Sequence, residues 1–597
     1  MRRRWRITPN LLSIAVAVLS PGPLLAQPTM PPVVVTAPLG GGIGGSLYLG
    51  QEALVGSRLG LTLREQPASV EIIPGEVIRT RGDWTAQEAV TRATGISAAG
   101  TPGDGSSALA SRGFVGNDSV TQLYDGTRLY VGAATMTFPV DTWFMDRVEV
   151  LRGPASVIDG VGAIGGAINY VPRQPLRQQR LTDARFAGGS YNTYQLGVNT
   201  TGPVTDRAAY QFGLIGTKSD GYVDMGDSRR LSMVSSLLLD ALPNFTLRLA
   251  FDSTWNEPAR YWGTPLNEGR IDDRLRKHNY NVSDSTIDWN DYWVRLGADW
   301  RIVPTVTLRN ELYFLKTDRH WRDVENYAFL PETSQVERIS YIEIFHDEHQ
   351  IGNRLDVRLD GKVLQRPYRL LAGFDVNQIY FKRTSNPPFD GETVVDAFHP
   401  IPGLFRDDPN VPATRPEFES RTTQLAFFTE GLLRVTDRFK LVAGLRVDYI
   451  DYSRDDFIDA TRSFDKTYSP VTWRVGSVFD VTKAVSLYGQ ITRGVDPLSS
   501  LITLPFRQRD TELTTAYQYE IGLKTQLFEG RAEATLATYY LVKHNLQTPN
   551  PNRPSETIQV GQQSSYGVEF AVGLRPQPFQ YGHLCAISLA VETCCPF

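Results

Sequence analysis

Alternation of apolar and polar side chains, in segments of about ten residues, is the feature that most constrains this chain. It runs from about residue 180 onward. Successive side chains of a strand point to opposite faces, and about ten residues is the length of a tilted strand that crosses a bilayer. The pattern therefore predicts membrane-spanning strands with one apolar face. Clear examples are Phe245, Leu247, Leu249 and Phe251, and further on Leu441, Ala443, Leu445, Val447 and Tyr449.

The connections between these segments come in two sizes. Short turns on one rim and long loops on the other are typical of an outer-membrane β-barrel. A secreted β-sandwich is the alternative, but its strands are about five or six residues long. We therefore expect a barrel over residues 176–578, with roughly 17 strands visible. The short turns are residues 202–206, 435–438 and 481–483, and the long stretches lie near 256–286, 317–345 and 383–420.

Composition and motifs exclude several other classes. A helical membrane bundle needs runs of about 20 apolar residues, which this chain lacks. Its net charge of −4 leaves no basic excess for a nucleic-acid partner. The sequence has no phosphate-binding loop and no nucleophile–base motif, so we expect no enzyme activity and no catalytic residue. We also expect no metal site, because His346 and His349 lie at strand positions that point to opposite faces. No cofactor is expected either.

The N-terminal segment predicts export. Arg2, Arg3, Arg4 and Arg6 precede an apolar run, residues 11–19, and cleavage fits after Ala26. This order is typical of a secretory signal peptide, residues 1–26. Residues 27–60, rich in proline, glycine and valine, are expected to form a flexible tail.

A compact α/β unit is expected over residues 61–175. Residues 70–73 predict a strand, residues 85–94 a short helix that Gly95 ends, and residues 147–151 another strand. A polar strand face inside a barrel needs water or a plug domain opposite it.

An ordered series of short motifs runs along the chain. The motifs are Ser111-Arg112-Gly113-Phe114, Asp125-Gly126-Thr127-Arg128, the segments 146–156 and 162–170, and, towards the C-terminus, the segments 519–524 and 567–569. With this series the chain resembles the TonB-dependent outer-membrane receptors, and among them the ferric-siderophore receptors, in which residues 61–175 would be the plug domain. The resemblance covers about residues 33–575.

The resemblance implies a transmembrane antiparallel β-barrel, of about 22 strands in the family, with an N-terminal α/β plug domain inside the lumen. It implies a location in the outer membrane of a Gram-negative bacterium, in contact with its lipid, and a monomer. It also implies a plug–barrel ionic lock made by Arg112 and Arg152 of the plug with Glu520 and Glu569 of the barrel.

The partner implied is TonB, with its inner-membrane proton-motive complex. An extended, β-prone segment can add as a strand to a partner's sheet. The segment that resembles the TonB box within the tail is Val33, Val34, Val35, Thr36 and Ala37.

The cargo implied is a ferric siderophore, held between the plug apex and the barrel loops, where aromatic faces suit aryl groups or cationic chelates. Another scarce solute, such as cobalamin, haem or an oligosaccharide, is the first alternative, and a passive porin and an exported enzyme are the others. The sequence does not identify the siderophore. The ligand-binding candidates are Asp118, Ser119, Thr135, Met136, Trp255, Tyr261 and Trp262.

The C-terminal segment departs from the pattern. After about Gln577 the alternation fails, and all three cysteines, Cys585, Cys594 and Cys595, lie there. Because Pro596 follows two cysteines, residues 579–597 are expected to be an aberrant tail that cannot be a normal last strand. We interpret it as the mark of a truncated or frameshifted gene, which leaves a non-functional truncated receptor as a further alternative.

Overall fold

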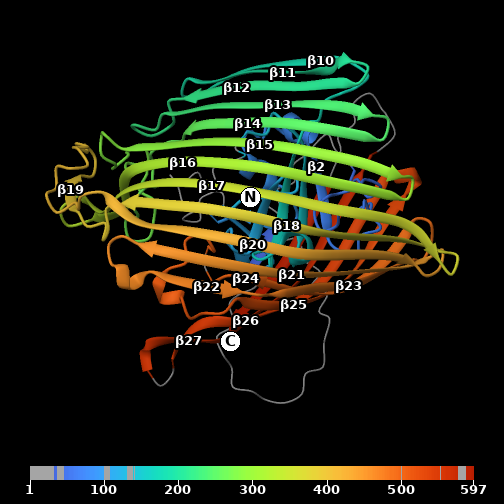
Figure 1. Cartoon of the computed structure of the whole chain (residues 1–597). Helices are drawn as coiled ribbons and strands as arrows, with labels where there is room; N and C mark the ends of the chain where they lie inside the picture. The colour runs from blue at the N-terminus through green and yellow to red at the C-terminus, as the bar shows by residue number, and fades with distance from the viewer. Residues whose placement is uncertain are drawn as a thin grey trace, which may run out of the picture.

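The computed structural model describes residues 33–36, 46–99, 108–130, 139, 141–498, 500–550, 553–575 and 586–596. They form a curved antiparallel β-sheet around a small mixed domain (Figure 1). The expected signal peptide, residues 1–26, lies outside the described residues.

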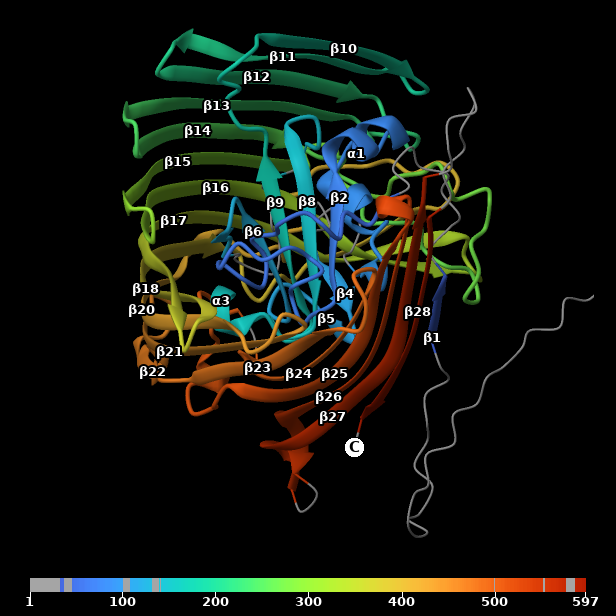
Figure 2. The ribbon, with the colours of Figure 1, turned by 90° about the vertical axis from the view of Figure 1, so that its right-hand side faces the viewer.

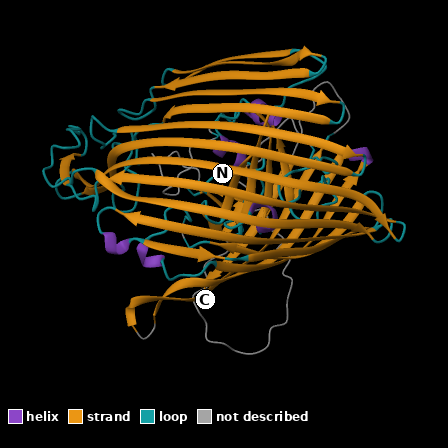
Figure 3. Cartoon of the chain, viewed as in Figure 1, coloured by secondary structure: helices purple, strands orange, loops and turns teal. Residues whose placement is uncertain are grey.

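The curved sheet is the wall of a transmembrane β-barrel. In the described part of the chain it contains 17 strands between β10 and β28, when the short strands β19 and β22 are set apart, in agreement with the number expected. Neighbouring strands pair antiparallel throughout (Figure 3). The bounds are β10 Leu181–Gly189, β11 Thr193–Thr205, β12 Ala208–Ser219, β13 Ser228–Leu242, β14 Phe245–Glu257, β15 Thr286–Val303, β16 Val306–Leu330, β17 Gln335–Val363, β18 Arg366–Ser385, β19 Glu392–Asp396, β20 Arg415–Arg434, β21 Phe439–Asp456, β22 Phe464–Tyr468, β23 Val471–Asp480, β24 Val485–Asp496, β25 Thr514–Leu527, β26 Ala532–Asn550, β27 Arg553–Leu574 and β28 Ala586–Pro596.

The two faces of the wall differ as the alternation predicts. In β21, Leu445 and Tyr449 are exposed on the outer face, whereas Arg446 and Asp448 are buried on the inner face. The apolar phase therefore faces lipid and the polar phase faces the plug.

The prediction of a long loop near residues 317–345 is wrong. β16 and β17 pair from Val306↔Leu359 to Leu330↔Gln335, so most of this stretch is a hairpin. A strand of 25 residues is much longer than the about 9–11 that cross a bilayer. Its far end extends beyond the membrane, where strand pairing needs no apolar face, and so polar residues occupy both faces.

The plug domain lies inside the curve of the wall (Figure 2). It contains a sheet of strand order β2-β8-β9-β6-β7 and a smaller sheet β3-β4-β5. Among the described residues, no helix has both the length and the apolarity needed to cross a membrane. The bounds are β2 Val70–Pro74, α1 Gly75–Arg81, α2 Ala86–Val90, β3 Ile96–Ala98, β4 Leu109–Ser111, β5 Phe114–Val115, β6 Val120–Tyr124, β7 Thr127–Arg128, β8 Met145–Arg152, α3 Ser156–Asp159 and β9 Gly166–Pro172.

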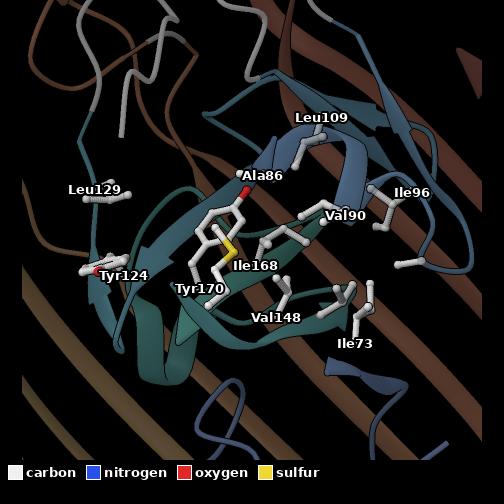
Figure 4. Close-up of a cluster of buried hydrophobic side chains, with 14 of the residues drawn as sticks. Ile73, Ala86, Val90, Ile96, Leu109, Tyr124, Leu129, Val148, Ile168 and Tyr170 are labelled. Carbon is white, nitrogen blue, oxygen red and sulfur yellow. The ribbon is translucent and has the colours of Figure 1, made fainter. Parts of the chain in front are cut away.

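The plug has its own apolar core, between α2 and the larger sheet. Ile73, Val148 and Ile168 from three strands of that sheet form one buried cluster with Val90 of α2 (Figure 4). Thr85 caps α2 with a capping box to Glu88, as a helix start requires. The helix ends at Val90 and is shorter than the expected 85–94.

The expected flexible tail is wrong for residues 46–60. Leu49 and Val55 pack against the plug core around Leu151, and Leu59 packs against Phe428 of the wall. The carbonyl oxygens of Leu59 and Gly60 also accept hydrogen bonds from Arg369 of β18 at 2.8 and 2.9 Å. Regularly placed leucines and valines gave this stretch enough apolar area to be buried.

The expectation that residues 579–597 are an aberrant tail without a normal last strand is wrong for residues 586–596. These residues form β28, which pairs with β27 from Gln563↔Pro596 to Gly573↔Ala586. Ile587, Leu589 and Val591 continue the period-2 pattern, and Pro596 is the last residue of the strand, a position where proline is tolerated. On its other edge β28 pairs with β1, Val33–Thr36.

Replacing Leu59 with alanine tests the packing of residues 46–60. Leu59 is fully buried, so the cavity left should destabilise the plug by about 2–5 kcal/mol. The measurement is the urea midpoint of plug unfolding in detergent, followed by proteolysis. Leu364→Ala, at an exposed turn, is the matched control and should leave the midpoint unchanged; equal midpoints for both variants would contradict the buried placement.

Candidate functional site: the plug–barrel interface

A two-residue turn presents Arg112 to the barrel wall. Ser111 of β4 pairs with Phe114 of β5, and Arg112 and Gly113 between them have φ values of 50° and 78°. Positive φ at both central residues is the signature of a type I′ hairpin turn, which glycine tolerates and arginine does not favour. The turn holds a strained arginine at the tip of a hairpin that points to β25 and β27.

Arg112 binds both barrel glutamates that the sequence predicts. Its Nη1 donates to Glu520 Oε2 at 2.7 Å, and its Nε and Nη2 donate to the two Glu569 oxygens at 2.9 and 2.8 Å. The second pair has the bidentate geometry that an arginine fork favours. The guanidinium also lies over the ring of Tyr539, 4.2 Å from its centroid.

Arg152 joins the same cluster through Glu569 alone. Its Nε lies 3.3 Å from Glu569 Oε2, and its Nη1 donates to Glu71 Oε2 of the plug at 2.8 Å. Ser69 Oγ bridges the two groups, since it accepts from Arg152 and donates to Glu569. The structure therefore brings all four predicted lock residues together, with Glu569 as the carboxylate that both arginines share.

The lock is sealed from water. Arg112 is fully buried, and Glu520 and Glu569 are 2% and 3% exposed. Burial by itself would lower the pKa of Arg112, but the two carboxylates raise that pKa well above its ordinary value. Arg112 therefore stays charged, and loss of one partner leaves a buried charge uncompensated, at a cost of about 3–5 kcal/mol.

Gly153 makes room for the lock. Its φ is 81°, and a Cβ there would stand 2.6 Å from Arg112 Nη1 and 2.1 Å from Gln518 Oε1. Only glycine fits this position, which explains the Arg152-Gly153 pair in the plug motif.

Sequence reasoning missed other barrel residues that hold the plug. Lys524 Nζ donates to the carbonyl oxygens of Leu63, Gln66 and Ala68 in the plug, at 2.5 to 2.8 Å. The available signal was its phase, because Lys524 lies four residues after Glu520 and so on the same inner face of β25.

A second charged cluster holds the plug on another part of the wall, with the charges reversed. Asp125 and Gly126, with φ values of 51° and 83°, form the turn between β6 and β7. Asp125 Oδ2 accepts hydrogen bonds from Arg248 of β14 at 2.5 Å and from Arg295 of β15 at 2.7 Å. A plug acid between two barrel arginines thus mirrors a plug arginine between two barrel glutamates.

The neighbours of the second cluster extend its contacts along the wall. Arg248 also binds Glu311 at 2.8 Å, and Arg295 binds Asp252 at 2.5 Å. Arg354 of β17 donates to the Gly126 carbonyl oxygen at 2.7 Å. Burial raises the pKa of Asp125, but the two arginines outweigh it and lower that pKa overall.

The ligand-binding candidates that the structure describes lie in different parts of the molecule. Ser119 Oγ donates to Asp496 of β24 at 2.7 Å and so is part of the plug–barrel contact. Burial raises the pKa of its neighbour Asp118 to about 6. Thr135 and Met136 lie outside the described residues, as does Ala37 of the predicted TonB box.

The structure separates the three aromatic candidates. The prediction for Trp255 is wrong, because it lies on the outward phase of β14, between the buried, inward residues Thr254 and Asn256. Trp262 Nε1 donates to the buried carboxylate of Asp323 at 2.5 Å and fixes a loop to β16. Tyr261 lies edge-on to Tyr222, 5.9 Å between ring centroids, at the long-loop rim.

The described side chains include no group of three or more His, Cys, Asp or Glu that could hold a metal ion. His346 is buried against Phe381 on the inner face of β17, and His349 stacks on Tyr380, 4.8 Å between centroids. The two histidines point to opposite faces, as their spacing predicts.

The fold and the interface define a plugged β-barrel, and comparison with known proteins gives the family. A family model described as "TonB dependent receptor-like, beta-barrel" matches residues 226–590, more than half of the chain, and the "TonB-dependent Receptor Plug Domain" matches residues 62–167. The chain belongs to the TonB-dependent receptor family.

Individual relatives are distant. The metal-pseudopaline receptor CntO of Pseudomonas aeruginosa is 23% identical over 470 residues, 72% of this chain and 61% of the relative. The ferric-pyoverdine M114 receptor PbuA of Pseudomonas sp. strain M114 is 24% identical over 86% of this chain and 64% of the relative. The chain thus spans about three fifths of the length of these relatives.

A solved structure confirms the fold. The pyoverdine outer-membrane receptor FpvA of Pseudomonas aeruginosa, bound to pyoverdine, superposes with a TM-score of 0.79 at 19% identity, covering 93% of this chain and 81% of that chain.

Unequal effects of the two lock glutamates test the geometry. Glu569→Gln should destabilise the seated plug by about 3–5 kcal/mol, and Glu520→Gln should destabilise it less, because Glu569 compensates two arginines and Glu520 one. The measurement is plug unfolding in urea, together with bilayer conductance. Glu529→Gln, an exposed change at the short-turn rim, is the control; equal losses for the two lock variants would show that Arg152 does not share Glu569.

The second cluster has its own test. Asp125→Asn should destabilise the plug by about 1–3 kcal/mol, less than the lock variants, because Arg248 and Arg295 keep Glu311 and Asp252 as partners. A double-mutant cycle of Asp125→Asn with Arg248→Gln should show coupling, measured by plug unfolding. Asp224→Asn in an outer loop is the control, and simple additivity in the cycle would contradict the contact.

Proposed function

We propose that this protein takes up ferric siderophores across the outer membrane of a Gram-negative bacterium, driven by TonB. The observation that carries the proposal is a folded plug held inside the barrel by a buried cluster of ion pairs. A channel for passive diffusion has no use for such a plug. Relatives named as ferric-pyoverdine and metal-pseudopaline receptors support a metal chelate as the cargo.

The charge clusters suit a plug that is moved by force. Each buried ion pair is firm while intact and is lost as a unit once one partner is displaced. Arg112 connects β4–β5 to β25 and β27, and Asp125 connects β6–β7 to β14 and β15. A directed pull on the N-terminal side of the plug would have to break both connections, and so the plug opens only when work is supplied.

We propose that TonB binds residues 33–36, and we call this segment the handle. They form strand β1 by pairing with the edge of β28. This pairing supports their capacity to add to a sheet edge, which is the mode of binding proposed for a TonB partner powered by the inner-membrane proton-motive complex. The receptor would act as a monomer surrounded by outer-membrane lipid, with no catalytic step and no cofactor.

Two cargo classes are distinguishable. The metal-pseudopaline relative, whose name does not specify iron, supports as a second candidate a chelate of another metal. Uptake of radiolabelled iron and of a second metal by cells that express this chain separates the two. Uptake of neither, with intact protein in the outer membrane, would contradict the proposed function.

Val35→Pro tests the handle. Proline lacks the N–H that a strand ladder needs, so the variant should reduce TonB-dependent uptake at least about tenfold and leave chelate binding at the cell surface unchanged. Val35→Ile, which keeps the β-prone character, is the matched control and should transport normally. Normal uptake by the proline variant would show that residues 33–36 are not the handle.

A further inference from the structure

A cavity of about 660 Å³ lies at the long-loop rim of the barrel. It opens between the beginning of β20, the end of β21 and the loop between β24 and β25. We call it the arginine cavity, after Arg415, Arg454, Arg462 and Arg507 in its lining, which also includes the acids Glu417 and Asp456.

The loop between β24 and β25 fixes the cavity above the plug. Ile502 of this loop is fully buried and packs with Phe381 and Phe418 of the wall, and Tyr130 of the plug packs against the same cluster. Ser420 Oγ donates to the Ile502 carbonyl oxygen at 2.6 Å. The loop is therefore anchored inside the barrel mouth.

Protein donors already occupy both acids of the cavity. Glu417 Oε2 lies 3.0 Å from Arg383 Nε and also accepts from Ser385. Asp456 Oδ2 accepts from Arg454 Nη2 at 3.1 Å, while its Oδ1 accepts the backbone N–H groups of Ile458 and Asp459. These carboxylates have little capacity left to hold a cationic ligand.

Two of the four arginines have protein partners in the described part of the chain and two do not. Arg454 pairs with Asp456, and Arg462 Nε lies 3.3 Å from Asp459 Oδ2. Across the described residues, no hydrogen bond or ion pair holds the guanidinium groups of Arg415 and Arg507, and both are exposed. Surface arginines are often merely hydrated, but these two line one concave cavity whose acids already have other donors.

An aromatic side chain completes the lining. Phe506 precedes Arg507, lines the cavity and lies edge-on to Phe464, 6.1 Å between ring centroids. Arginine forks bind carboxylate-like oxygen pairs in a bidentate manner, and a phenyl ring packs against a flat aryl group.

We propose that the arginine cavity binds an anionic, planar oxygen-donor group and so selects metal chelates with net negative charge. The inference rests on the proposed function and names its substrate class. Three dianionic catecholates on one ferric ion leave a net negative charge, whereas three monoanionic hydroxamates leave none. The first class fits Arg415 and Arg507, and the second gains nothing from them.

The test measures binding to the purified full chain in detergent, by quenching of protein fluorescence. The two probes are a ferric tris-catecholate chelate and a neutral ferric tris-hydroxamate chelate. We expect the catecholate to bind more tightly and to weaken as salt is raised. Arg415→Gln and Arg507→Gln should each weaken its binding about tenfold, the double variant more, and Arg507→Lys less than Arg507→Gln.

Matched controls separate charge from folding. Arg276→Gln removes an exposed arginine from another long loop and should leave catecholate binding unchanged. Heat-modifiable gel mobility should show that every variant keeps a folded barrel. Unchanged catecholate affinity in the double variant, or equal loss of affinity for both chelates, would overturn the inference and leave the proposed function standing. No binding of either chelate by the parent chain would count against both.

Discussion

Burial of charge between the plug and the wall is the constraint on which the rest of this structure depends. A barrel of this width has a polar inner face, and its arginines and acids need partners. The plug supplies them with charged groups placed on hairpin turns. Arg112 meets two glutamates, and Asp125 meets two arginines. Because the lock is buried and the Asp125–Arg295 pair of the second cluster nearly so, each cluster is costly to leave half-formed, and so the plug has one well-defined position inside the wall.

The two turns explain why short motifs in the plug carry so much information. Both are two-residue hairpins whose central residues have positive φ, and glycine is the second residue in each. A hairpin tip is the point of a small sheet that can extend furthest toward the wall. Placing the single charge there lets one side chain reach two strands. The ion pairs that it forms offset the free-energy cost of the strained backbone.

Much of the fold follows from the sequence because the governing pattern is local. Period-2 alternation depends only on the geometry of a strand, so the wall, its strand number and the inward phase of Glu520 and Glu569 were all predictable. The failures have non-local causes. Residues 46–60 were expected to be flexible because composition does not reveal the apolar surface that covers Leu59. Residues 317–345 were expected to be a loop because the pattern changes once a strand extends beyond lipid, and Trp255 was misassigned because its phase was not followed along β14.

By itself, the sequence determined the class of fold, the plug and the four residues of the lock, because motif order and strand phase survive without coordinates. Only the tertiary structure decided that Glu569 serves both arginines, that Asp125 forms a reversed counterpart on β14 and β15, and that Lys524 binds three plug carbonyl groups. It alone placed Arg415 and Arg507, 92 residues apart in the chain, around one cavity. The physical reason is that charge pairing and cavity shape depend on distances between segments far apart in sequence, which no local pattern encodes.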